Sequence, residues 1–134
     1  MEIFDLVWER IRNSGLGQLI PIIYADHYPE VTPTNQLSGE FIVLTSLSNV
    51  IGDDQVASVN VNVYVPDITP TINRTEQRYP NRARFKEIIP IALESLNSYP
   101  LDERYHFSVR GENLISEENV PYSFVNLKIQ LINY

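Results

Sequence analysis

The sequence predicts a single α+β domain, in which two helices pack on one face of a mostly antiparallel sheet of about four to five strands. Two segments carry apolar side chains at helical spacing, and three others alternate apolar with other residues, as half-buried strands do. The predicted order along the chain is α-β-β-β-α-β-β. Because at most two short βαβ-like connections fit this order, a doubly wound parallel sheet is not expected. A chain of 134 residues has the usual size of one domain, so we assign residues 1–134 to it.

The first predicted helix comprises residues 1–14. Ile3, Val7 and Ile11 stand four positions apart and therefore share one face of a helix. Gly15 is expected to end this helix, because glycine readily adopts the left-handed conformation that follows a helix.

The next segments predict a short strand followed by a β-hairpin. Residues 19–25 are apolar and β-branched, and Pro21 cannot donate to a ladder, so this strand is expected at an edge of the sheet or to be irregular. Residues 40–48 form a strongly apolar strand, and residues 55–65 alternate with a strict period of two. A Gly-Asp-Asp turn between them indicates a hairpin. The valines expected to face the core are Val59, Val61, Val63 and Val65.

The second half of the chain predicts one helix and two amphipathic strands. The helix spans residues 81–98, and Asn81 is expected to cap its start. Pro90 is expected to kink this helix or to split it into two, since an interior proline removes a backbone hydrogen bond. Alternating residues predict strands over 104–110 and 122–133, with a turn region between them.

Two long segments, near residues 26–39 and 66–80, have no periodicity and are rich in proline and threonine. Connections of this length are uncommon in compact domains and are often functional. We interpret both as extended arms, and we hypothesise that arms and open sheet edges contact neighbouring subunits.

The composition limits the classes of partner and site. The formal net charge of −7 and a pI near 4.7 disfavour non-specific binding to nucleic acid or to anionic membranes. The sequence has no cysteine, which excludes disulfides and thiolate metal sites and favours a reducing compartment. Its first residues do not resemble a signal peptide, and no apolar run approaches the ~20 residues of a membrane span.

Metal-ligating residues do not form a convincing cluster in the sequence. Asp26, His27 and Glu30 lie close together, but adjacent side chains on an extended segment point to opposite sides. We therefore interpret His27 as an exposed loop histidine. His106 falls on the polar side of a predicted strand and is interpreted as a surface residue. We expect neither a metal nor another cofactor.

The sequence also indicates no catalytic site. Nucleophile-elbow and glycine-rich phosphate motifs are missing. The carboxylate pairs Asp53–Asp54 and Glu117–Glu118 fall in predicted turns, where both side chains are expected to be solvated. The glycosylation pattern at residues 73–75 is interpreted as chance. The protein is therefore expected not to be an enzyme.

A local group of basic residues contrasts with the acidic chain. Five of the ten basic residues fall between positions 74 and 86, where Glu76 is the one acidic residue. A basic patch on an acidic protein can match a complementary surface on a partner or on the next subunit; the alternative is a solvated loop and first helical turn. The residues expected to make such a contact are Arg74, Arg78, Arg82, Arg84 and Lys86.

The order of these elements resembles that of a known family. An amphipathic N-terminal helix precedes a short strand and a proline-containing loop, and then come EFIVLTSLS, a GDD turn and VASVNVNVYV. The helix RFKEIIPIALESLN and the strand VPYSFVNLKIQLIN follow. The chain is similar in this respect to the tail terminator, or tail completion, proteins of tailed phages. The long segment 66–80 and the Pro90 helix depart from the pattern.

The resemblance implies a structural, non-enzymatic role. Members of that family form a ring, typically a hexamer, at the head-proximal end of the tail tube. It therefore implies a homo-oligomer that contacts the tail tube protein and a head or neck connector protein, within a virion tail assembled in the host cytoplasm. Alternatives are another head–tail connector or neck protein, the cap of a contractile injection tube, or a small-ligand-binding module or enzyme.

Overall fold

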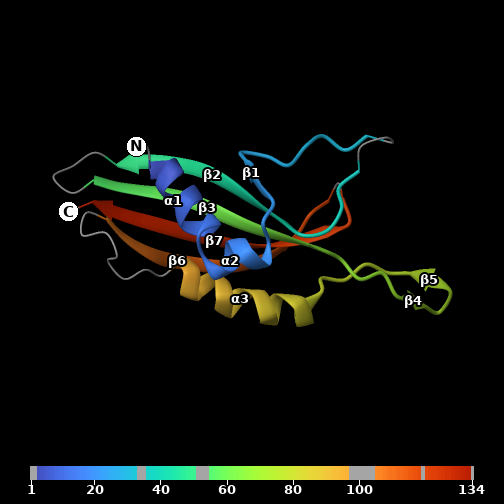
Figure 1. Ribbon diagram of the computed structural model, residues 1–134. Helices are drawn as coiled ribbons and strands as arrows, with labels where there is room; N and C mark the ends of the chain where they lie inside the picture. The colour runs from blue at the N-terminus through green and yellow to red at the C-terminus, as the bar shows by residue number, and fades with distance from the viewer. Residues whose placement is uncertain (1–2, 33–35, 51–54, 97–104, 119, 134) are drawn as a thin grey trace.

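The computed structural model describes residues 3–32, 36–50, 55–96, 105–118 and 120–133. In these residues, three helices lie on one face of a five-stranded sheet, and a short two-stranded hairpin extends beyond one end of the sheet (Figure 1). The helices are α1 (Ile3–Arg12), α2 (Gly15–Leu19) and α3 (Arg82–Leu96). The sheet has the order β1 (Ile23–Ala25), β2 (Phe41–Val50), β3 (Gln55–Pro66), β7 (Tyr122–Asn133) and β6 (Tyr105–Ser116). The separate hairpin consists of β4 (Thr71–Ile72) and β5 (Thr75–Glu76).

The predicted α+β class, with one sheet and helices on one face, is confirmed, but the sheet is mixed. β2, β3, β7 and β6 pair antiparallel, as expected, and β2 and β3 form the predicted hairpin. β1 pairs parallel to β2, with Ile23 opposite Ile42. A parallel partner is possible here because the loop after β1 returns the chain to the start of β2. β1 occupies an edge, as the proline at position 21 suggested.

The predicted order α-β-β-β-α-β-β is wrong in two places. Residues 15–19 form the helix α2, whereas residue 19 was expected to begin a strand, and Gly15 begins that helix instead of ending the first. Ser14 separates the two helices, since its hydroxyl accepts a hydrogen bond from the Gly17 N–H at 3.5 Å. The second difference is the β4–β5 hairpin, which lies within the segment 66–80 that was expected to be irregular.

The helix α3 is continuous through Pro90, so of the two outcomes predicted for this proline, a kink or a split, the split is wrong. The side chain of Pro90 is exposed on the outer side of the helix. The buried residues on the other side pack the helix against the sheet. Asn81 caps the helix as predicted, since its Oδ1 accepts from the Arg84 N–H at 3.2 Å.

The strand β6 extends six residues beyond the predicted end at residue 110. A register shift between Val109 and Gly111 marks a bulge, so the glycine interrupts the ladder without ending it.

The main core lies between the helices and one face of the sheet. The alternating valines of β3 meet the apolar face of α3, as the periodicity predicted. Burial of this apolar surface, at about 25 cal/mol per Å², is the main stabilising contribution. Its largest fully buried residues include Ile11, Leu16, Ile20, Ile42, Leu44, Ile88, Leu96, Leu127 and Ile129.

A second, aromatic cluster covers one end of the opposite face of the sheet. Phe41 and Tyr64 stack with ring centroids 4.8 Å apart, and Tyr28 packs edge-on to Tyr64 at 5.5 Å. Tyr28 and Leu37 belong to the segment 26–39, so part of this predicted arm packs on its own domain. The first arm is therefore a partial cover for the sheet, whereas the second extends away from it (Figure 1).

Candidate interaction site

Residues 68–79 form a hairpin, here called the arm, which continues β3 past the end of the sheet (Figure 1). Ile68 and Tyr79 exchange two backbone hydrogen bonds of 2.9 and 2.8 Å, and Ile72 pairs with Thr75 at the other end. Asn73 and Arg74 both have positive φ, at 51° and 65°. Two such central residues make a type I′ turn, whose twist matches that of a two-residue hairpin.

The base of the arm is fixed to the β6–β7 turn by one arginine. Arg78 donates from Nη1 to the Val120 carbonyl at 2.9 Å and from Nη2 to the Glu117 carbonyl at 2.6 Å. Its Nε lies 2.9 Å from Oδ2 of Asp67. Arg78, Asp67, Ser123 and the carbonyls of Glu117 and Val120 are called the arginine clamp below. The planar guanidinium suits this role, because it presents several donors in a fixed geometry.

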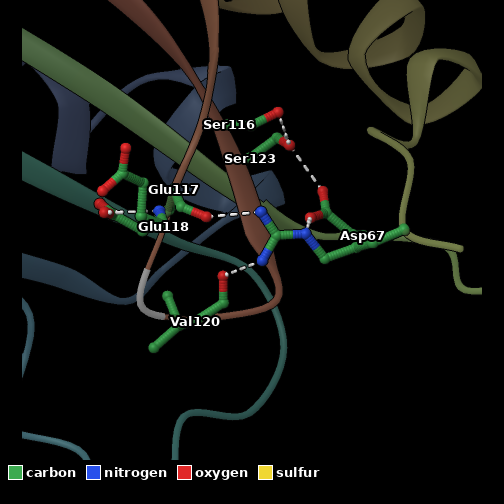
Figure 2. Close-up of polar contacts among 7 residues, drawn as sticks. Asp67, Ser116, Glu117, Glu118, Val120 and Ser123 are labelled. Carbon is green, nitrogen blue, oxygen red and sulfur yellow. Dashed lines mark hydrogen bonds and ion pairs between the residues drawn. The ribbon is translucent and has the colours of Figure 1, made fainter.

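The acidic half of the clamp is almost completely buried. The Asp67 side chain is 1% exposed, whereas that of Arg78 is 34% exposed. Ser123 donates to Oδ1 of Asp67 at 2.6 Å, and its hydroxyl lies 3.4 Å from that of Ser116, as Figure 2 shows. Oδ2 accepts no hydrogen bond from a described residue, so its compensation is the charge of Arg78. A buried carboxylate requires such a partner, because desolvation of a lone charge is costly.

A main-chain bond completes the attachment. The Asp67 N–H donates to the Pro121 carbonyl at 2.9 Å. Both ends of the arm are thus attached to the domain, through Asp67 directly before it and through Arg78 near its end. Because these contacts attach both ends of the arm to the domain, the clamp can fix the direction in which the arm extends.

The five predicted contact residues divide into two groups. Arg78 and Arg84 bind within the chain. The other three, Arg74, Arg82 and Lys86, are exposed and form no ion pair with a residue that the structure describes. Arg74 occupies the turn of the arm, whereas Arg82 and Lys86 are four positions apart on α3. Three of the five thus remain available to a partner.

Arg84 connects the start of α3 to the start of β2. Its Nε and Nη2 donate to the two carboxylate oxygens of Glu40 at 2.6 and 2.8 Å, and Nη1 donates to Glu87 at 3.0 Å. Hydrogen bonding to Glu40 raises the pKa of Arg84 above its ordinary value, against the opposing effect of burial. This contact orients the helix that follows the arm.

The residues considered for metal binding and catalysis form no site in the described part of the chain. His27 is exposed, and its Nδ1 lies 2.6 Å from the carbonyl oxygen of Tyr28. Because a carbonyl oxygen only accepts, Nδ1 is the donor in this hydrogen bond. The Glu117 carboxylate accepts from the Glu118 N–H at 3.1 Å. Among the described residues, no three His, Asp or Glu side chains gather as metal ligands, and no helix is long and apolar enough to span a membrane. Asp53–Asp54 and the side chain of His106 lie outside the described part.

Sequence reasoning missed Asp67 and Ser123. Asp67 directly follows a strand and Ser123 occupies an inward position among apolar residues of β7, where a hydroxyl is 0% exposed. A polar residue at an inward position of an alternating strand is a signal of a buried hydrogen bond. Nothing in the sequence joins it to Asp67, which lies 56 positions away.

Comparison with known proteins adds no further assignment. No protein-family model matches the chain, and no curated protein matches it significantly.

Proposed function

We propose that this chain is a structural subunit of a phage virion, a tail terminator that assembles as a ring at the head-proximal end of the tail tube. The observation that supports this most is the arm, which projects from the domain and is fixed at its base by Arg78. An arm of defined direction is suited to reach a neighbouring subunit, and a ring needs such contacts at each junction.

The charges and the order of elements also support the proposal. The exposed basic residues Arg74, Arg82 and Lys86 belong to a chain of net charge −7, so copies of the chain can attract one another at complementary surfaces. The order of elements resembles the tail terminator family, and the partners proposed from this are the tail tube protein and a neck or head connector.

The test is assembly with a tube protein encoded by the same genome. The purified chain is examined by native mass spectrometry and negative-stain electron microscopy, alone and added to polymerising tube protein. We expect a closed ring that binds tube ends and stops their growth. A ring that binds the portal or neck protein and ignores tube ends would assign the chain to another connector. A monomer at high concentration that leaves tube growth unchanged would refute a ring subunit.

A further inference from the structure

We infer that the arm of one copy docks on the outer edge of β6 of the next copy, so that neighbouring subunits form a head-to-tail contact. This inference rests on the proposed function, because it specifies how the subunits of the ring meet. It is carried by three features: an open strand edge, an arm that cannot reach its own edge, and complementary charges.

The strand β6 pairs with β7 on one side, and no other strand of the described residues pairs with it on the other. Edge strands in natural proteins are often protected by prolines, lysines or bulges. The bulge of β6 lies between Val109 and Gly111, and residues 111–116 beyond it contain neither proline nor lysine and only one charged residue, Glu112. Leu114 and Ile115, whose side chains point to opposite faces of the sheet, are 37% and 42% exposed. This half of the edge therefore offers main-chain groups and apolar contacts on both faces.

The arm offers matching groups. Its ladder is defined by two hydrogen-bonded pairs. Ile68 and Tyr79 exchange two hydrogen bonds, and the Gln77 N–H donates to the Pro70 carbonyl at 3.0 Å. In an antiparallel ladder, the main chain of the intervening residues points outward, which applies to Thr69 and Arg78. Ile68 and Tyr79 are 48% and 41% exposed. An isolated two-stranded hairpin is marginally stable in water, so added pairing would stabilise it.

The arm cannot make this contact within its own chain. The arginine clamp fixes its base to the β6–β7 turn, and from there it extends away from the sheet, whereas β6 runs back along the sheet from the same turn (Figure 1). The edge of another copy is free of this restriction. Because the arm and the edge are different surfaces, their contact is heterologous, and repeating it gives a ring or a filament.

The charges favour this pairing over a contact between two arms or two edges. Residues 68–79 of the arm carry two arginines and one glutamate, and Arg74 is exposed at the turn, whereas residues 111–118 of the edge and the turn after it carry three glutamates and no basic residue. Two arms would oppose like charges at their tips, and two edges would oppose their glutamates. The combination of one arm with one edge places opposite charges together.

Leu114→Lys tests the edge, because a lysine on an open strand blocks further pairing. The matched control is Ile22→Lys, which places the same charge at an exposed residue beside β1, the other edge of the sheet. A second variant replaces residues 71–76 with Asn-Gly, which shortens the arm between the paired residues Pro70 and Gln77 and keeps the clamp. We expect Leu114→Lys and the shortened arm each to weaken self-association about tenfold or more by analytical ultracentrifugation, and Ile22→Lys to leave it unchanged.

Cysteine cross-linking locates the contact directly, since the chain has no native cysteine. Thr75→Cys and Asn113→Cys proteins are mixed and oxidised, and we expect their mixed disulfide in clear excess over that between Thr75→Cys and Ile22→Cys. Equal yields of the two disulfides would overturn the inference, and so would Leu114→Lys and shortened-arm variants that both self-associate as tightly as the parent. Neither result would contradict the proposed ring. If these variants dissociate an open filament that ignores tube ends, the inference stands and the terminator role fails. A chain that stays monomeric alone and with tube protein would contradict both.

Discussion

The guanidinium of Arg78 lies 2.9 Å from the carboxylate of Asp67, so an ion pair joins the residue directly before the arm to the last residue but one of the arm. The same guanidinium binds two carbonyls of the β6–β7 turn. One side chain therefore joins the two ends of the arm to each other and to the domain.

Arg78→Ala is expected to lower the free energy of unfolding by about 2–3 kcal/mol, because it leaves the buried Asp67 carboxylate with the Ser123 hydroxyl alone. Arg82→Ala, an exposed arginine of the same segment, is the control and is expected to change it by less than about 0.5 kcal/mol. Urea unfolding followed by circular dichroism measures both.

A double-mutant cycle separates the ion pair from the rest of the clamp. In the Asp67→Asn background, Arg78→Ala no longer leaves a buried carboxylate without a partner. The loss in free energy of unfolding caused by Arg78→Ala should therefore be smaller by at least about 1 kcal/mol. Additive effects of the two substitutions would mean that the pair is not coupled.

Gly17→Ala is expected to destabilise the protein by about 2 kcal/mol or more. A Cβ at this position would lie 2.2 Å from the Ile11 carbonyl oxygen, which is backbone and cannot move aside without shifting α1. Gly15→Ala is the matched control, because its Cβ would meet Ile91 at 3.6 Å, an ordinary contact. Thermal unfolding of the two variants should therefore differ clearly, and equal melting temperatures would refute the close approach of α1 and α2.

Arg74→Gly is expected to stabilise the arm locally by about 0.5–1 kcal/mol. Arg74 has φ of 65°, a conformation that costs a non-glycine residue about 1 kcal/mol, and Asn-Gly is the preferred pair for this turn. Hydrogen exchange of the Gln77 and Tyr79 amides reports the effect, since both donate across the arm. Their protection should rise about threefold, whereas a decrease would show that the Arg74 side chain contributes more than its strain.

Strict periodicity allowed most of the sheet to be predicted. The valines of residues 59–65 and the alternating residues 125–129 lie in the core, because a period of two leaves no other buried arrangement. Shorter signals failed where local preference and tertiary context disagree. Gly111 resembles a turn residue, but its ladder continues through a bulge, and Pro90 is tolerated because the helix around it packs on the sheet.

The candidate site was less accessible to sequence reasoning. The basic group at residues 74–86 was visible as a count of charges, but the count could not show that Arg78 and Arg84 bind within the chain. Their partners are distant in the sequence, since Asp67 lies 11 positions from Arg78 and Glu40 lies 44 positions from Arg84. The arm was predicted as an extended connection, while its hairpin went unrecognised because each strand has only two residues and its turn lacks the usual glycine.

The aromatic cluster makes the stability depend on pH in the alkaline range. Burial raises the pKa of Tyr28, Tyr64 and Tyr122, and the charge of Glu117 adds to this for Tyr28 and Tyr64. An unfolded tyrosine ionises near pH 10, so above about pH 10 the unfolded chain binds fewer protons than the folded one. The free energy of unfolding is therefore at its full value below about pH 10 and falls as the pH rises, by up to ~1.4 kcal/mol per pH unit for each tyrosine.

Tyr64→Phe tests this directly, because it keeps the ring in the stack with Phe41 and removes one titrating group. Its effect on the free energy of unfolding should be constant between about pH 7 and 9, where both states are protonated, which serves as the control. Above about pH 10, the variant should lose stability less steeply than the parent, by up to ~1.4 kcal/mol per pH unit in urea titrations. If the free energies of unfolding of the variant and the parent stay parallel up to a pH of about 11, Tyr64 ionises alike in the folded and unfolded chains. Burial of Tyr64 would then not make the stability depend on pH.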